Sequence, residues 1–165
     1  MTKDKGTFLQ LIQENKGIIV VICNNYCKDR EDRNDLAQEI VFNLWKGFAD
    51  YKPDYKFSTW MYRIALNIAI SFYRKEMRSL QFSPYSDDLI VFDDEVEDKL
   101  ETETNLARLE RFIQGLKEID RSIMLLYLED KSYREIAQIV GISDSNVATK
   151  INRIKIILKS KFTQE

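Results

Sequence analysis

The chain has 165 residues, of which 44% are apolar and 32% are charged, and its formal net charge is −2. This composition is typical of a soluble globular protein with one domain or two small ones, and it excludes a disordered or membrane-spanning chain. With no histidine and only two cysteines, the chain has no means for histidine-dependent catalysis, histidine-ligated or four-cysteine metal sites, or a disulfide framework. We therefore expect no catalytic residue, no cofactor and no metal site.

Two further features point to an all-α protein of the cytoplasm. Only five glycines and two prolines are present, which leaves little material for hairpins and favours helices. At the amino terminus, Lys3, Asp4 and Lys5 precede only a short apolar cluster, so we expect no secretory segment. We expect a cytoplasmic protein with no membrane insertion.

The amino-terminal segment is expected to be helical, and its clearest helix covers residues 35–49. Four apolar residues recur there at steps of four and predict a buried face: Leu36, Ile40, Leu44 and Phe48. The following segment, residues 51–57, contains Pro53 and is expected to be a loop. Ser58 or Thr59 would then cap the next helix.

That next helix is expected to run from about residue 59 to residue 78 and to have two distinct faces. One face gathers apolar side chains for the core: Met61, Ile64, Ala65, Ile68 and Phe72. The other gathers polar and cationic side chains within roughly 80° of arc: Arg63, Asn67, Ser71, Arg74 and Arg78. One side would pack, and the other would present cations to a polyanion.

Charge is distributed unevenly along the chain. Residues 86–104 contain nine acids and one lysine, a net charge of −8, so the remainder of the chain carries +6. Residues 81–105 lack helical periodicity at first and are expected to form an acidic flexible linker. It would join two small helical domains, residues 1–80 and residues 106–165, each with a basic cluster for a polyanion. The alternative interpretation of each basic cluster is a solvated helix face.

The carboxy-terminal domain carries the sharpest local signal, a helix-turn-helix. Helix is expected to resume at about Leu106, and Asp120 is a suitable cap for the helix that follows. Ser132 followed by Glu135 has the pattern of a capping box, and Gly141 suits the left-handed turn between two helices. Beyond the turn, Ser143 caps a second helix with an apolar stripe: Val147, Ile151, Ile154 and Leu158.

This second helix is built like a DNA-recognition helix. From Ser145 to Gln164 it contains no acid, and the side opposite its stripe carries short polar groups and cations. Arginine and asparagine side chains can make bidentate contacts to base edges, and lysines can contact phosphates. The face comprises Ser145, Thr149, Asn152 and Arg153, flanked by Lys150 and Lys159. We interpret the motif as DNA-binding; the alternative is an ordinary amphipathic hairpin.

Three stretches in this order have the pattern of a known family: residues 35–45 (DLAQEIVFNLW), residues 57–67 (FSTWMYRIALN) and residues 132–153 (SYREIAQIVGISDSNVATKINR). Together they resemble the sigma factors of bacterial RNA polymerase, specifically the compact two-domain, extracytoplasmic-function (ECF) kind of the sigma-70 family. The first stretch resembles the family's polymerase-binding helix, the second its promoter-melting and −10-reading segment, and the third its −35-reading helix-turn-helix. The resemblance covers most of the chain.

The resemblance implies a non-enzymatic factor that binds core RNA polymerase and promoter DNA, directs promoter-specific transcription initiation, and is held in check by an anti-sigma factor. The residues implied for polymerase binding are Asp35, Gln38, Glu39, Asn43 and Trp45. Those implied at the −10 element are Trp60, Arg63, Asn67, Arg74, Lys75 and Arg78. Those implied at the −35 element are Ser145, Asn146, Thr149, Lys150, Asn152 and Arg153.

Several interpretations stay open from the sequence. Aromatic rings can hold an unstacked base, and candidates near the −10 segment are Tyr51, Tyr55, Phe57 and Trp60. We hypothesise that the acidic linker threads a basic RNA path of the polymerase; the alternative is a solubilising spacer. A free-standing helix-turn-helix regulator and a protein-binding helical adaptor are alternatives for the whole chain.

Four residues stand outside these assignments. Leu66 stands where the family often has Arg, and Lys117 where it often has Pro. Cys23 and Cys27 lie one helical turn apart and have the spacing of a redox or metal pair. Without histidine or further cysteines, we favour two buried free thiols.

Overall fold

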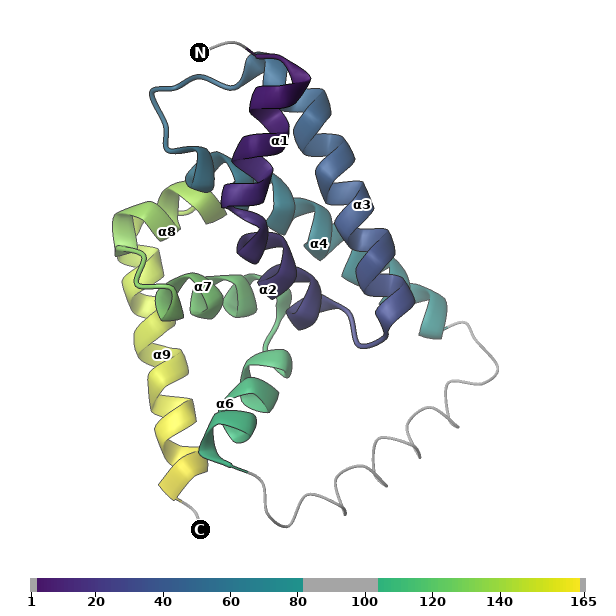
Figure 1. Ribbon diagram of the computed structural model, residues 1–165. Coiled ribbons are helices and arrows are strands. Elements are labelled where there is room, and N and C mark those ends of the chain that lie inside the picture. Colours follow the sequence, from purple (N-terminus) through teal and green to yellow (C-terminus); the bar gives the residue numbers. More distant parts are fainter. Residues whose placement is uncertain (1–2, 82–103, 164–165) are drawn as a thin grey trace.

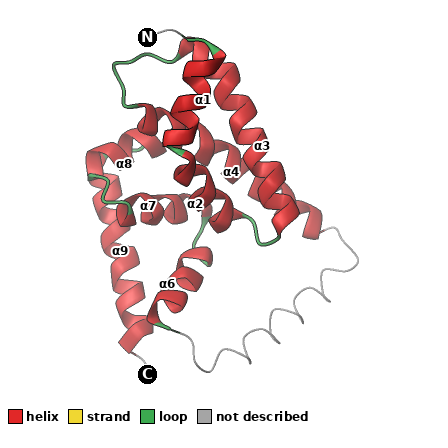
Figure 2. Cartoon of the chain, viewed as in Figure 1, coloured by secondary structure: helices red, strands yellow, loops and turns green. Residues whose placement is uncertain are grey.

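The structure is a computed structural model that describes residues 3–81 and 104–163 (Figure 1). Within these ranges every regular element is a helix, as Figure 2 shows. The amino-terminal elements are α1 (Lys5–Glu14), α2 (Lys16–Tyr26), α3 (Arg30–Gly47), a 3-10 helix η1 (Phe48–Asp50) and α4 (Phe57–Gln81). The carboxy-terminal elements are α6 (Asn105–Gln114), α7 (Glu118–Leu128), α8 (Tyr133–Val140) and α9 (Asp144–Thr163). The all-helical prediction is confirmed for the described residues.

The predicted acidic linker falls almost entirely on residues 82–103, which lie outside the described residues. Its flexibility, its path and the domain boundaries at residues 80 and 106 therefore stay predictions. On either side of this segment, α4 ends at Gln81 and α6 begins at Asn105. No helix in the described ranges is both long and apolar enough to cross a bilayer.

The amino-terminal helices pack around the apolar face of α3. Helices α2, α3 and α4 all contact one another, and Figure 1 shows α1 alongside α3. Leu36, Ile40 and Leu44 have no exposed surface and Phe48 is buried, so the predicted face is confirmed. Complete burial of a leucine or isoleucine side chain contributes about 1.5–3 kcal/mol. This face is therefore a main source of the stability of the bundle.

Helix α4 buries a second face in addition to the predicted one. Met61 and Ala65 are buried as predicted, while three other members of that face are half-buried: Ile64, Ile68 and Phe72. Tyr62 and Leu66 lie outside the predicted face and are also buried. The ammonium of Lys131 lies 5.7 Å from the Tyr62 ring centroid, which places this second face against the carboxy-terminal helices. Helical periodicity alone does not reveal a contact between segments so far apart in sequence.

The predicted cap of α4 is wrong. The helix begins at Phe57, so Ser58 and Thr59 lie in its first turn. Phe57 is buried, and its ring lies 5.3 Å from that of Trp60 and 5.6 Å from that of Tyr51. The first residue of the helix thus packs its ring into an aromatic cluster.

The predicted cap of α7 is also wrong. The helix begins at Glu118, and Lys117 holds the N-cap position without a side-chain hydrogen bond. Asp120 therefore lies inside the first turn, where a carboxylate still interacts favourably with the helix dipole. Its oxygens contact α9, as described below.

The helix-turn-helix is confirmed in its local detail. The Ser132 hydroxyl accepts a hydrogen bond from the backbone N–H of Glu135 at 3.1 Å, and Gly141 has the left-handed conformation with φ 85°. After the turn, the Ser143 hydroxyl accepts from the Asn146 N–H at 3.1 Å and so caps α9. The stripe of α9 is buried at Val147, Ile151 and Ile154, with Leu158 half-buried. This stripe docks α9 on α7 and α8.

Candidate nucleic-acid and partner surfaces

The outer face of α9 is the first of three candidate surfaces. Ser145, Asn146, Thr149, Asn152 and Arg153 are exposed there, on the side opposite the buried stripe. The Thr149 hydroxyl donates to the Ser145 carbonyl oxygen at 3.0 Å, which occupies its proton but leaves an acceptor lone pair outward. The face therefore offers hydroxyl, amide and guanidinium groups on one rigid helix.

Two cations of α9 form ion pairs with Asp120 of α7. The Lys150 ammonium lies 3.4 Å from Asp120 Oδ1, and its side chain is only 25% exposed. Arg153 Nη2 lies 3.8 Å from Asp120 Oδ2, but the Arg153 side chain is 58% exposed. The Arg153 side chain is thus largely exposed, with one nitrogen near Asp120. The Lys150 side chain is mostly buried, and its ion pair joins α9 to α7.

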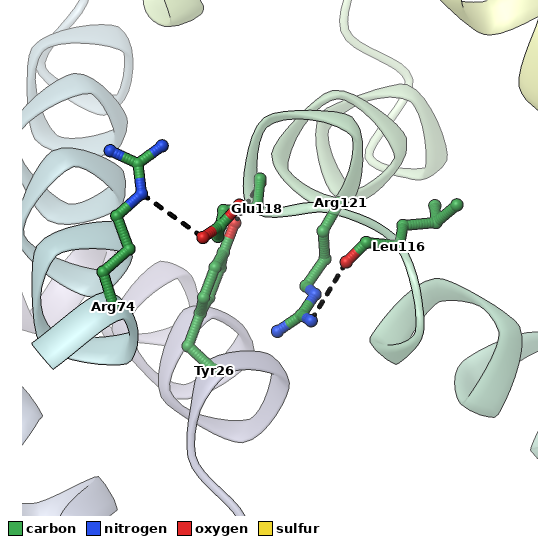
Figure 3. A network of polar contacts seen from close by, with 5 residues as sticks. All are labelled: Tyr26, Arg74, Leu116, Glu118 and Arg121. Carbon is green, nitrogen blue, oxygen red and sulfur yellow. Dashed lines mark hydrogen bonds and ion pairs between the residues drawn. The ribbon is translucent and has the colours of Figure 1, made fainter. Parts of the chain in front are cut away.

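The second candidate surface is the cationic side of α4. Arg63, Asn67, Lys75 and Arg78 are exposed on this helix. Arg74 is also exposed, but its Nε lies 3.3 Å from Glu118 Oε1 of α7, as Figure 3 shows. Most of the surface is thus open, and one of its cations is paired with the carboxy-terminal half.

The aromatic candidates near the start of α4 form a cluster rather than a row of exposed rings. Tyr51 and Phe57 are buried, and Trp60 is half-buried with its ring centroid 5.1 Å from that of Tyr51. Tyr55 is the exposed member, and its carbonyl oxygen accepts a hydrogen bond from the Tyr51 hydroxyl at 2.6 Å. Tyr51 and Phe57 therefore support the fold, and Tyr55 and Trp60 are the rings that a base can approach.

The third candidate surface is an apolar groove of about 570 Å³ between α1 and α3. Of the predicted polymerase-binding residues, Gln38 and Trp45 line it. Asp35 and Glu39 are exposed outside the groove, and Asn43 is half-buried and donates to the Glu39 carbonyl oxygen at 2.8 Å. The structure therefore brings together only part of the predicted set.

Sequence reasoning missed the residues that give this groove its character. Phe42 is 63% exposed and Leu9 is 48% exposed, and both line the groove beside Val41. A contiguous exposed apolar patch marks an interaction surface, whereas single scattered apolar residues do not. The signal was present, because Phe42 and Trp45 are large apolar residues at a helical step outside the predicted stripe.

The two cysteines are free and buried. Burial raises the pKa of the Cys23 thiol to about 11 and that of the Cys27 thiol to about 12. In the described part of the chain, no group of three or more His, Cys, Asp or Glu side chains is arranged to hold a metal ion. The expectation of two buried thiols is confirmed.

The comparisons with known proteins agree with this geometry. Residues 11–79 match the family model described as Sigma-70 region 2, and residues 106–158 match that described as Sigma-70, region 4. The RNA polymerase sigma factor YlaC of Bacillus subtilis is 30% identical over 138 residues, which are 81% of this chain and 79% of that protein.

The chain belongs to the sigma-70 family.

Within that family it is a sigma factor of the ECF kind, with region 2 and region 4. The ECF RNA polymerase sigma factor SigW of Bacillus subtilis is 26% identical over 168 residues, covering 96% of this chain and 90% of that protein. A sigma factor is a non-enzymatic initiation factor that binds core RNA polymerase and promoter DNA. Region 2, which contains α4, binds the −10 element, and region 4, which contains the helix-turn-helix, binds the −35 element.

Solved structures share the fold of this sigma factor over nearly its whole length. One is CnrH in complex with the cytosolic domain of CnrY, with a TM-score of 0.68 and 22% identity, covering 96% of this chain and 89% of that chain. Another is the sigma factor RpoE in complex with the anti-sigma factor NepR from Bartonella quintana, with a TM-score of 0.72 and 16% identity. The match covers 96% of this chain and 98% of that chain.

Proposed function

We propose that this ECF sigma factor reads the −35 element with the outer face of α9: Ser145, Asn146, Thr149, Lys150, Asn152 and Arg153. The observation that carries the proposal is an acid-free polar face exposed on a helix whose opposite stripe is buried. Asn152 and Arg153 are the residues able to make bidentate base contacts, each worth about 1–3 kcal/mol of discrimination. Ser145, Asn146 and Thr149 contact phosphates or base edges near the helix start, and Lys150 contacts phosphate.

The test uses core polymerase and promoter fragments in which each base pair of the −35 element is substituted in turn. Transcripts with a defined start are expected only when the chain is added. Arg153→Ala should reduce discrimination at one or two upstream positions by about 1–3 kcal/mol. The matched control is Lys159→Ala, which removes an exposed lysine later on the same helix. It should weaken binding to all promoter sequences equally. If Arg153→Ala instead loses the same binding free energy on every sequence, Arg153 contacts a phosphate and not a base edge.

We propose that the cationic side of α4 grips the −10 element through Arg63, Asn67, Arg74, Lys75 and Arg78, with Trp60 beside the separated strands. The exposure of these side chains along a single helix supports this assignment. Stacking of an unpaired base on an aromatic ring contributes about 1–3 kcal/mol. Asn67→Ala removes an exposed amide from this side of α4 and should slow open-complex formation, measured by permanganate reactivity of −10 thymines. Ser71→Ala, on the same helix face, is the control that should leave it unchanged.

We propose that core RNA polymerase binds at the apolar groove between α1 and α3 and its acidic rim. Gln38, Trp45 and Phe42 form the groove contacts, and Asp35, Glu39 and Asn43 lie on the polar flank of α3. Phe42→Ser should weaken binding to core polymerase about tenfold or more, the loss typical of a central aromatic residue. Val20→Ser, which removes an exposed apolar side chain from α2, is the matched control. Equal affinity of the two variants would exclude the groove as the polymerase site.

We infer that the protein works in the cytoplasm and that an anti-sigma factor restrains it. The support for a restraining partner is that both solved neighbours are held by another protein, one of them named as an anti-sigma factor. The decisive measurement is functional: a protein purified in complex with this chain must suppress its transcripts in the reconstituted reaction. A bound protein that leaves transcription unchanged would not be such a factor.

A further inference from the structure

A small cationic pocket lies at the carboxy-terminal end of α9, where its last turn meets α6 (Figure 1). It has a volume of about 310 Å³, and every residue that lines it is cationic or aromatic: Arg108, Arg111, Phe112, Lys161 and Phe162. Lys161 lies about 12 Å beyond Arg153 along α9, given a rise of about 1.5 Å per helical residue. The pocket is therefore separate from the outer face of α9 that we assign to the −35 element.

The two helices exchange contacts between cations and rings across this pocket. The Arg108 guanidinium carbon of α6 lies 4.3 Å from the ring centroid of Phe162 of α9. In return, the Lys161 ammonium of α9 lies 5.3 Å from the ring centroid of Phe112 of α6. Arginine has five N–H donors and lysine has three, so a cation beside one ring keeps donors for an anion. The pocket thus offers positive charge and apolar surface together.

The chain itself contains an anionic segment that matches the pocket. Residues 82–103, outside the described ranges, contain nine acids and one lysine, a net charge of −8. Single apolar residues stand among the acids at steps of four: Phe92, Val96 and Leu100. Carboxylates form charge-assisted hydrogen bonds with arginine and lysine, and apolar side chains pack against aromatic rings. The mixture of acids and apolar residues is therefore the chemical counterpart of a pocket made of cations and rings.

The acidic segment also ends beside the pocket. Thr104, the first described residue after it, caps α6 by accepting a hydrogen bond from the Ala107 N–H at 3.2 Å. Arg108 follows about 6 Å further along the helix. The eight residues from Val96 to the cap span at most about 28 Å, so their acids stay within reach of the pocket. Short tethers keep a binding group at an effective concentration in the millimolar range.

We propose that the pocket is a docking site for this acidic segment, residues 86–103, in the protein free of nucleic acid. The docked carboxylates contact Arg111 and Lys161 and occupy positions that DNA phosphates would otherwise take. Cations held by carboxylates release no counterions from DNA, so the docked segment weakens binding that is independent of sequence. The outer face of α9 stays exposed, so base contacts supply a larger share of the remaining affinity. Only this consequence rests on the proposed DNA-binding function; the docking itself does not.

A spin label at residue 96 tests the docking in the full-length chain. Val96→Cys adds a reactive thiol without removing an acid, while the native Cys23 and Cys27 are buried and stay unlabelled. In nuclear magnetic resonance spectra, the label should cause a loss of amide signal at Phe162, in the last turn of α9. The signal should recover at high salt, because salt screens the ion pairs that hold the segment.

A charge reversal inside the pocket should release the labelled segment. With Lys161→Glu, the amide signal of Phe162 should return even at low salt. The matched control is Lys159→Glu, the same charge change on an exposed position of α9 outside the pocket, which should leave the signal loss unchanged. Lys161→Gln, a milder change, should give an intermediate loss, and circular dichroism should show equal helical content in all variants. Equal signal loss in Lys161→Glu and Lys159→Glu would overturn the docking.

A DNA-binding measurement tests the consequence with a variant that changes only the segment: Asp93→Asn, Asp94→Asn, Glu95→Gln, Glu97→Gln and Asp98→Asn. On a duplex of unrelated sequence it should bind about tenfold more tightly at low salt, and the slope of log affinity against log salt should steepen by about 0.9 for each cation uncovered. Adding Arg111→Gln and Lys161→Gln should remove most of this gain; an equal gain without the pocket cations would mean a diffuse charge effect and no docking. Because the spin label reports without DNA or polymerase, a failed transcription assay with the segment docked would count against the proposed promoter contacts alone.

Discussion

Asp120→Asn should loosen α9 from α7 and at the same time free two cations for DNA. The Asp120 carboxylate is only 15% exposed and lies 3.4 Å from Lys150 Nζ and 3.8 Å from Arg153 Nη2. Exposed ion pairs contribute about 0.2–1 kcal/mol each. The Lys150 pair belongs near the upper limit because both partners are largely buried, and the Arg153 pair near the lower limit. We therefore expect the free energy of unfolding to fall by about 1–1.5 kcal/mol.

The same substitution removes the acid that competes with phosphate for Lys150 and Arg153. Each added phosphate contact steepens the dependence of log affinity on log salt by about 0.9. Urea denaturation followed by circular dichroism measures the first effect, and fluorescence anisotropy of a duplex at several salt concentrations measures the second. Glu110→Gln, which removes an exposed acid from α6, is the control for net charge. Unchanged stability together with DNA binding no tighter than that of the control would refute this role of Asp120.

Three other predictions concern a left-handed glycine, a carboxyl group with a raised pKa and two buried thiols. Gly141→Ala should destabilise the protein by about 1–2 kcal/mol, because the left-handed backbone at φ 85° strains any Cβ although nothing lies within 4 Å of it; thermal denaturation checks this, and an unchanged Tm would contradict it. Glu76→Gln should stabilise the protein by a few tenths of a kcal/mol at neutral pH, because partial burial and the nearby Asp32 raise the pKa of Glu76 above its ordinary value. A carboxyl with a raised pKa in the folded state favours folding while protonated and loses that contribution as pH rises through its pKa, so the advantage of the variant should vanish in acid; urea titrations across pH decide the sign. Cys23 and Cys27 should resist iodoacetamide in the native protein at neutral pH and react in denaturant, because burial raises their thiol pKa values to about 11 and about 12; mass spectrometry showing native labelling would contradict this.

Local signals in the sequence predicted the helix-turn-helix closely. The cap at Ser132, the left-handed Gly141 and the cap at Ser143 each act within four residues of their own position. Short-range chemistry of this kind is independent of the rest of the chain. The same holds for the stripe of α3, whose period of four residues identified its buried face.

Where packing competes with local chemistry, sequence reasoning was less accurate. Ser58 and Asp120 have the residue types of caps, yet α4 begins at Phe57 and α7 begins at Glu118. In the first case an aromatic ring packs into a cluster assembled from several elements. In the second, a carboxylate binds cations from another helix. Such preferences depend on partners that no local window contains.

Some features of the candidate surfaces follow from local sequence, and others depend on tertiary packing. The sequence alone determined that α9 has one apolar and one cationic face, because both follow from helical periodicity within a single element. Only the tertiary structure decided that α1 completes an apolar groove with Phe42, that Lys150 is held by Asp120, and that Arg121 is enclosed by Tyr26 and Tyr73. Each of these contacts joins side chains far apart in sequence, and their pairing is set by how whole helices pack, which residue types and spacing do not encode locally.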